Sequence, residues 1–123
     1  MRSKSDVGKT GEDIACEYLV KNGYKILHRN YREKWDEIDI IAKDKRQTIV
    51  FVEVKTFAGA MSSGLLPEDN LTAAKLKKLR RACQAFAVKN EDLIDDRRGW
   101  RIDLLAIELG DKEKPEIRHY ENI

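Results

Sequence analysis

Two stretches decide the fold, Glu37-Ile38-Asp39-Ile40-Ile41 and, shortly after it, Thr48-Ile49-Val50-Phe51-Val52-Glu53-Val54-Lys55. β-Branched residues are frequent in both runs, which predicts two β-strands. Because an unpartnered buried charge is costly, ordinary core strands exclude ionisable residues. Successive strand residues point to opposite faces, so Glu53 and Lys55 share one otherwise apolar face. A carboxylate beside an ammonium on such a face indicates a functional site.

The linker between the two runs is short and polar, which predicts an antiparallel hairpin. A turn centred on Arg46 opposes Ile41 to Phe51 and Asp39 to Glu53, and opposed residues point to the same face. A slip of one residue would mix polar and apolar faces, so it is disfavoured. Opposed Cβ atoms lie ~4.5–5.5 Å apart. Two carboxylates that close repel each other unless a cation or a proton lies between them.

The other predicted elements are a helix over 7–22, a strand over 24–31, a helix over 71–90, a strand over 100–109 and a short edge strand over 117–120. The segment 57–70 contains Gly59, Gly64 and Pro67 without clean periodicity, and we expect a functional or mobile loop there. With strands over 37–42 and 48–56, the order αβββαβ predicts an α/β sandwich around a central mixed sheet. A length of 123 residues predicts a single domain, 1–123.

Composition excludes several classes of protein. Charged residues make up 37% of the chain but the net charge is only +2, so nucleic-acid binding would need a local basic patch. The 41% hydrophobic fraction argues against disorder. Because the sequence lacks a long apolar stretch and an apolar leader, we expect a cytoplasmic protein with no membrane contact. We interpret the two cysteines as buried thiols, and two isolated histidines do not make a zinc site.

Glu12 is a third candidate acid. At 100° per residue it falls on the same side of the first helix as Gly8, Ala15 and Leu19, a side suited to close packing on the sheet. A glutamate there is out of place unless it points at something. Gly8 and Gly11 would let the helix backbone approach the strands closely. We therefore expect Glu12 to reach the acids of the hairpin.

Glu12, Asp39 and Glu53, with Lys55 beside them, form the predicted catalytic cluster. Its three carboxylates are hard oxygen ligands that suit Mg²⁺ or Mn²⁺, with water and a substrate phosphate completing the shell. Such a metal polarises a phosphoryl oxygen and lowers the pKa of bound water. Lys55 would orient the attacking water or stabilise developing charge. The cluster predicts metal-assisted phosphodiester hydrolysis and calls for no small-molecule cofactor.

With these residues in place, the chain resembles the PD-(D/E)xK nuclease superfamily, and more closely its YraN-like bacterial branch. The matching pieces are Gly11-Glu12, Asn30-Tyr31-Arg32, Glu37-Ile38-Asp39-Ile40, Phe51-Val52-Glu53-Val54-Lys55-Thr56 and Arg101-Ile102-Asp103. The resemblance implies a restriction-endonuclease-like fold and a DNA endonuclease acting on branched or single-stranded intermediates of repair or recombination. Resolvase-like relatives act as dimers, which implies a homodimer as one option for this chain.

Three positions depart from the pattern of the resembled families. Ile38 stands where the superfamily has proline, and Asp36 stands where the YraN-like branch usually has glycine. Phe57 follows Thr56 where arginine is usual, which removes one candidate phosphate contact.

Simpler interpretations stand beside these. A lone Glu-x-Lys on a strand is usually a surface ion pair worth under ~1 kcal/mol. The basic run Lys75, Lys77, Lys78 and Arg81 is either a solvated helix face or a sequence-independent phosphate contact. Two rival functions are a nucleic-acid-binding module without turnover and a protein-interaction subunit with a vestigial site. Acids next to phosphates weaken binding without metal, so the intact cluster favours the enzyme.

Four further residues stay open at this level. Glu37 is either an additional ligand or exposed at a strand start. For Asp103 we favour a structural role, in a buried network or paired with Arg101 or Arg81. Trp35 and Phe57 suit base stacking and core packing equally well.

Overall fold

The computed structural model describes residues 4–34, 36–58, 71–110 and 114–123, with side chains from residue 7 onward. The helices are α1 (Lys4–Lys21), α2 (Ala73–Lys89) and the short 3-10 helix η2 (Glu91–Leu93). The strands are β1 (Lys25–Arg32), β2 (Glu37–Lys43), β3 (Ile49–Phe57), β4 (Trp100–Glu108) and β5 (Glu116–Tyr120). Helix α2 begins at the N-cap Thr72, whose hydroxyl accepts a hydrogen bond from the Lys75 backbone N–H at 3.2 Å.

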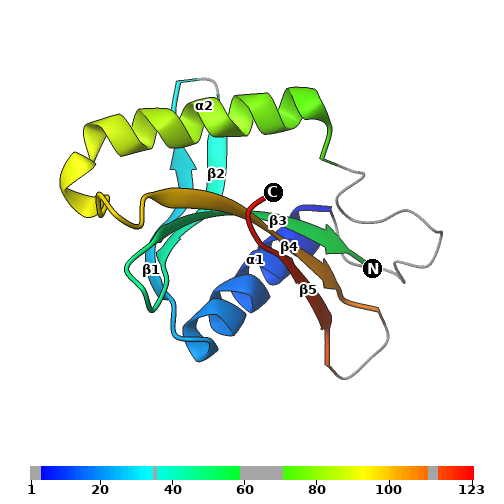
Figure 1. The fold of residues 1–123 in the computed structure, drawn as a ribbon. Coiled ribbons are helices and arrows are strands. Elements are labelled where there is room, and N and C mark those ends of the chain that lie inside the picture. Colours follow the sequence, from blue (N-terminus) through cyan, green and yellow to red (C-terminus); the bar gives the residue numbers. More distant parts are fainter. Residues whose placement is uncertain (1–3, 35, 59–70, 111–113) are drawn as a thin grey trace.

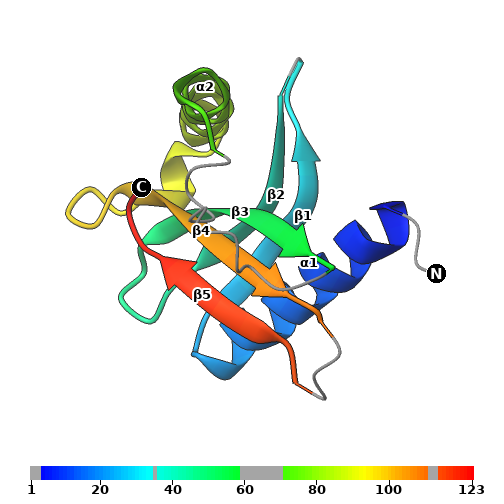
Figure 2. The ribbon, with the colours of Figure 1, turned by 90° about the vertical axis from the view of Figure 1, so that its right-hand side faces the viewer.

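The five strands form one sheet in the order β1-β2-β3-β4-β5. Strands β3 and β4 are parallel, and the other neighbours are antiparallel. A parallel pair needs a crossover connection, and α2 lies in the segment that joins β3 to β4. Figures 1 and 2 show α2 on one face of the sheet and α1 on the other. The predicted α/β sandwich with a central mixed sheet is confirmed, and its elements follow the predicted order αβββαβ with β5 at the edge.

Two apolar layers, one on each face of the sheet, make up the core. The α1 side contains Ala15, Leu19, Ile40, Ala42, Val50, Val52, Leu105, Ile107 and Leu109. The α2 side contains Ile38, Ile41, Ile49, Phe51, Leu79, Ala82, Cys83, Phe86 and Ile102. Along β3 the two layers alternate residue by residue, as period-two patterning predicted.

The predicted register of the β2–β3 hairpin is confirmed, since Ile41 lies opposite Phe51. At the turn, the Asp44 carboxylate accepts hydrogen bonds from the backbone N–H groups of Arg46, at 2.8 Å, and Thr48, at 2.9 Å. The described ladder ends at the pair Ile40–Val52, so Asp39, the neighbour of Ile40, is the first residue of β2 outside it. The strands β2 and β3 therefore separate at Asp39.

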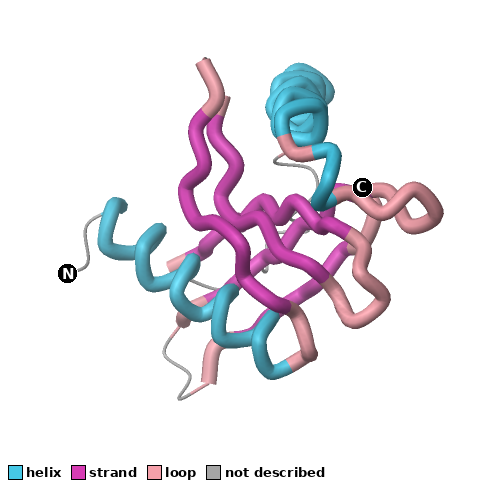
Figure 3. The backbone as a smooth tube through the Cα atoms, turned by 90° about the vertical axis from the view of Figure 1, so that its left-hand side faces the viewer, coloured by secondary structure: helices cyan, strands magenta, loops and turns pink. Residues whose placement is uncertain are grey.

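Helix α1 crosses the end of β3 at Gly11, which is buried. A Cβ atom at Gly11 would collide with the Thr56 side chain, so only glycine permits this approach. The same role predicted for Gly8 is wrong, because no atom of the described residues would lie within 4 Å of a Cβ atom there. Figure 3 shows α1 running across the sheet strands. The contact of Gly11 with β3 sets the position of the next residue, Glu12.

The β1–β2 hairpin extends beyond the rest of the sheet and rises beside α2 (Figures 1 and 2). Its strand β1 carries a register shift between Ile26 and His28, and Asn30 adopts a left-handed conformation with φ of 51°. Beyond Asn30 the ring of Tyr31 packs edge-on against Phe86 of α2, with ring centroids 5.1 Å apart. In the part of the chain that the structure describes, neither long helix is apolar enough to cross a bilayer.

Candidate acidic site

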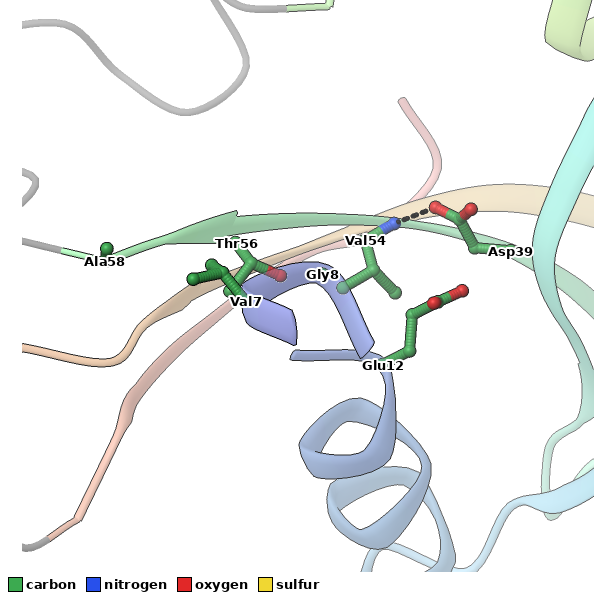
Figure 4. A pocket seen from close by; sticks show the side chains of 7 residues that line it. All are labelled: Val7, Gly8, Glu12, Asp39, Val54, Thr56 and Ala58. Atoms are coloured by element: carbon green, nitrogen blue, oxygen red, sulfur yellow. Dashed lines mark hydrogen bonds between the residues drawn. The ribbon is translucent and has the colours of Figure 1, made fainter. Parts of the chain in front are cut away.

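Asp39 lies where β2 separates from β3. Its Oδ2 atom accepts a hydrogen bond of 2.8 Å from the backbone N–H of Val54, drawn as the dashed line in Figure 4. A backbone carbonyl of β2 would accept this N–H in a continued ladder. The Asp39 carboxylate replaces that acceptor, so the side chain is held at the edge of β3 in the gap between the two strands.

The carboxyl groups of Asp39 and Glu53 interact closely enough for each to affect the pKa of the other. Burial, followed by the charge of Asp39, raises the pKa of Glu53 to about 8. Burial also raises the pKa of Asp39, against the lowering effect of the Val54 N–H. Because the pKa of Glu53 lies above neutrality, Glu53 keeps its proton at pH 7 when no cation is bound.

The two acids open to different faces of the sheet. Asp39 borders a cavity of about 540 Å³ on the α1 side, with Glu12, Val54 and Thr56. Glu53 and Lys55 border a groove of about 280 Å³ on the α2 side. The two carboxyl groups nevertheless affect each other's pKa at the point where β2 leaves the ladder.

Glu12 extends from α1 toward Asp39 (Figure 4), as its place on the helix predicted. Burial, and after it the charge of Asp39, raises the pKa of Glu12. With the Asn30 amide nitrogen facing the acids, it donates hydrogen bonds to Glu12 Oε1 at 2.8 Å and Glu37 Oε1 at 3.2 Å. Asn30 was not singled out as a site residue, although it begins one of the matching sequence pieces.

Glu37 belongs electrostatically to the same cluster. Its charge is among the causes that raise the pKa values of both Asp39 and Glu12. Glu37 Oε2 forms an ion pair with Arg32 Nη2 at 3.8 Å. The Arg32 side chain is 81% exposed, so solvent weakens this pair. The charge of Lys55 opposes the rise in the pKa values of Asp39 and Glu53. The four acids and Lys55 together form what we call the acidic cluster.

The predicted basic run on α2 divides into three parts. Lys75 and Lys78 border the groove that contains Glu53 and Lys55, and the charge of Lys75 lowers the pKa of Glu53. Lys77 is exposed and is absent from the described lining of that groove. Arg81 donates from Nε to Asp36 Oδ2 at 3.2 Å. Only two of the four predicted phosphate contacts therefore face the acids.

Asp103 lies outside this cluster, in the buried network that the sequence favoured. Arg101 Nε donates to Asp103 Oδ1 at 3.0 Å, and His119 Nε2 lies 2.7 Å from Oδ2. The backbone N–H of Asn122 donates to Oδ1 at 2.9 Å. Burial pushes the pKa of Asp103 up, but the bonds from His119 and Arg101 hold it below its ordinary value.

Asp103, His119 and Glu121 have potential ligand atoms within 4.8 Å of one another. The Arg101 guanidinium already pairs with Asp103 at 3.0 Å and lies 3.9 Å from Glu121. A metal ion there would have to displace or face that positive charge. We therefore assign this group to structure, and not to the metal site that the sequence predicted.

Trp35 and residues 59–70, which the sequence analysis considered for base stacking and for a functional loop, lie outside the described residues. Phe57 is the last residue of β3, and its carbonyl accepts a hydrogen bond from the Leu109 N–H at 2.8 Å. Its backbone thus extends the sheet beyond the predicted strand end.

Comparison with known proteins gives a family match and a set of relatives. The family described as "Uncharacterised protein family UPF0102" matches residues 11–107. A UPF0102 protein of Trichlorobacter lovleyi is 40% identical over 116 residues, which cover 94% of this chain and 87% of that protein. A UPF0102 protein of Mycobacterium avium is 36% identical, with 98% of this chain and 91% of that protein covered.

Among solved structures, one match is the crystal structure of a repair endonuclease from Pyrococcus abyssi. The TM-score is 0.47 and the sequence identity is 14%. The alignment covers 90% of this chain and 40% of that endonuclease chain.

Proposed function

Because this chain belongs to the uncharacterised family UPF0102, its activity must be inferred from its own site, and we propose that it is a metal-dependent DNA nuclease. The observation that carries the proposal is the meeting of Asp39 and Glu53 in the gap between β2 and β3, with Glu12 facing them from α1. Scaffold strands do not normally concentrate acids in this way.

The residues fit a divalent cation. Among the described residues, no ion pair within 4.0 Å neutralises Glu12, Asp39 or Glu53, and the pKa of each is raised. A cation between them would relieve the repulsion that now keeps a proton in the pair. We propose Asp39, Glu53 and Glu12 as ligands of Mg²⁺ or Mn²⁺, because both ions prefer hard oxygen donors.

When bound, such an ion supplies Lewis-acid polarisation of a phosphoryl oxygen and lowers the pKa of its bound water. Lys55 contributes a positive charge beside Glu53, on the side of the sheet that faces α2. We assign to Lys55 the orientation of the attacking water and the stabilisation of charge that develops on the phosphate. The Asn30 amide, which donates to both Glu12 and Glu37, keeps the Glu12 carboxylate turned toward Asp39.

Lys75 and Lys78 provide phosphate contacts on the same groove. Both are exposed residues of α2, so their ammonium groups are accessible to a nucleic-acid backbone. Contacts of this kind hold a strand in place without reading its sequence. We propose DNA as the partner, with branched or single-stranded repair and recombination intermediates as the substrate class that the motif resemblance implies. A homodimer remains a prediction from the same resemblance.

The deciding experiment compares wild type with Glu53→Gln on labelled single-stranded, duplex, flap and four-way-junction DNA. Each reaction contains Mg²⁺, Mn²⁺ or EDTA. Glu91→Gln is the matched control, because it makes the same chemical change at an exposed residue of η2 outside the acidic cluster. We expect cutting only with metal, its loss in Glu53→Gln and its retention in Glu91→Gln. Metal-independent cutting, or equal cutting by Glu53→Gln, contradicts the proposal.

Binding without turnover is the rival outcome of the same experiment. Under that rival, Glu53→Gln would bind DNA about as tightly as wild type at pH 7 without metal, because the Glu53 carboxyl already holds a proton there. No DNA would be cut in any metal.

A further inference from the structure

Two ion pairs connect α2 to the turn that joins β1 to β2. Arg81 Nε lies 3.2 Å from Asp36 Oδ2, and Lys89 Nζ lies 2.9 Å from Glu33 Oε2. The acids are well covered, with side-chain exposures of 8% for Asp36 and 12% for Glu33. The cations are exposed at 61% and 62%, so the acids are the buried members of both pairs.

The hairpin turn is itself closed by backbone hydrogen bonds. The Glu33 N–H donates to the Asp36 carbonyl at 2.8 Å, and the Asp36 N–H donates to the Glu33 carbonyl at 3.2 Å. Tyr31 donates its hydroxyl to Glu33 Oε1 at 2.5 Å. This bond, and then that of Lys89, holds the pKa of Glu33 below its ordinary value. The turn therefore presents a fixed and ionised Glu33 to α2.

The same helix carries the lysines of the proposed phosphate groove. Asp36, Glu37, Glu53, Lys55, Lys75 and Lys78 border that groove together. Lys78 precedes Arg81 by three residues, which is about one helical turn and roughly 4.5 Å of rise. Because a helix is rigid over one turn, Lys78 and Arg81 keep a fixed spacing along α2.

We propose that Asp36 and Arg81 are positioning residues, which place Lys75 and Lys78 over the acids of the site. This inference rests on the proposed function. An arginine suits the task, because its planar guanidinium donates from more than one nitrogen, here Nε at 3.2 Å and one Nη at 3.5 Å.

A direct phosphate contact by Arg81, as the sequence suggested, is the competing role, and the two roles predict opposite effects. If Arg81 positions α2, then Asp36→Asn and Arg81→Ala both impair the same step. If Arg81 binds phosphate, Asp36 competes with the DNA for it. Asp36→Asn then improves DNA binding while Arg81→Ala weakens it.

The kinetic test measures kcat and KM with Mn²⁺ for Asp36→Asn, Arg81→Ala, the double variant and Arg81→Lys. We expect kcat to fall about three- to tenfold in both single variants. The kcat of the double variant should be no lower than that of the more impaired single variant, because all three variants lose the same interaction. Arg81→Lys should recover part of kcat. An unchanged kcat with lowered KM in Asp36→Asn overturns the proposal.

A second test follows α2 without any need for activity. Cys83 lies on the packed face of α2 with 0% exposure, so its reaction with a thiol reagent reports separation of α2 from the sheet. In a Cys16→Ser background, we expect Arg81→Ala to raise the Cys83 reaction rate about three- to tenfold. Lys77→Ala, which removes the same charge from an exposed position on α2, should leave this rate unchanged.

An unaltered Cys83 rate in Arg81→Ala overturns the positioning role, whatever the nuclease assay shows. If wild type cuts no DNA but Arg81→Ala raises the Cys83 rate, the proposed function fails and the pair still determines how α2 docks. The two failures are therefore distinguishable.

Discussion

The Asp39 carboxylate occupies the position of a strand acceptor, bonded to the Val54 N–H, and its charge helps to raise the pKa of Glu53 on the neighbouring strand. The β2–β3 ladder ends one residue earlier, at Ile40 and Val52. The geometry of the acidic cluster thus depends on where two strands separate.

A divalent metal should stabilise the fold if it binds the acidic cluster. A ligand that binds only the folded state adds about 2.7 kcal/mol when its concentration is 100 times its Kd. We expect Mg²⁺ and Mn²⁺ to raise the Tm by several degrees in wild type, and by the same amount in Glu91→Gln. Glu53→Gln should lose the response. Equal metal-induced shifts in Glu53→Gln and wild type would place the ion elsewhere.

Metal-free stability should fall as the pH rises past neutrality. The pKa of Glu53 is raised to about 8 in the folded protein, from an ordinary value of 4.5. The folded state therefore binds the proton more tightly, and stability is fully present below about pH 4.5 and is lost as the pH rises through about 8. Urea unfolding between pH 6 and pH 9 measures this loss.

Glu53→Gln should flatten that profile and exceed wild type in stability at pH 9, because the amide cannot ionise. A parallel decline in both proteins would show that another group causes the pH dependence. Saturating Mn²⁺ should also remove the decline in wild type, since the ion replaces the proton.

Gly11→Ala and Gly8→Ala should act in opposite directions, although both lie on α1. The added methyl group at Gly11 collides with Thr56, and overpacking of this kind costs roughly 1–3 kcal/mol. The methyl group at Gly8 meets no atom of the described residues within 4 Å, so the higher helix propensity of alanine should stabilise by up to ~1 kcal/mol. Urea denaturation measures both. Destabilisation by Gly8→Ala equal to that by Gly11→Ala would refute the close contact between α1 and β3.

Asp103→Asn should destabilise the protein and leave the metal response intact. Asp103 is fully buried and pairs with Arg101, and loss of one partner of a buried pair costs about 3–5 kcal/mol. Glu121→Gln should cost under ~1 kcal/mol, because Glu121 is 63% exposed at 3.9 Å from Arg101. Thermal scans with and without Mn²⁺ separate the two roles. Loss of the metal response in Asp103→Asn, at a temperature where it is folded, would reassign the metal site.

Lys75→Ala with Lys78→Ala should reduce the salt dependence of DNA binding. Each lost phosphate contact lowers the slope of log K against log salt by ~0.7–0.9. Two contacts predict a decrease of about 1.4–1.8. Lys77→Ala should change the slope less, since Lys77 does not border the described groove. If each single lysine variant changed this slope equally, the DNA would instead respond to the summed positive charge of α2.

The elements and their pairing were predictable because they follow from local periodicity. The period of two in β3 and the short linker to β2 were enough for the register that places Ile41 opposite Phe51. Glu12 was predictable for a similar reason, since a charged residue on the apolar side of α1 requires a partner. The same helical argument misjudged Gly8, because it cannot tell which turn of the helix meets the sheet.

Local side-chain patterns were enough to predict which segments become strands and helices and which acids are out of place in them, because these features depend on residues a few positions apart. They could not predict that the Asp39 carboxylate accepts the Val54 N–H, or that Arg81 pairs with Asp36, 45 residues away. Both outcomes depend on where strands separate and how α2 lies across the hairpin. That geometry arises from long-range packing, which local patterns do not encode.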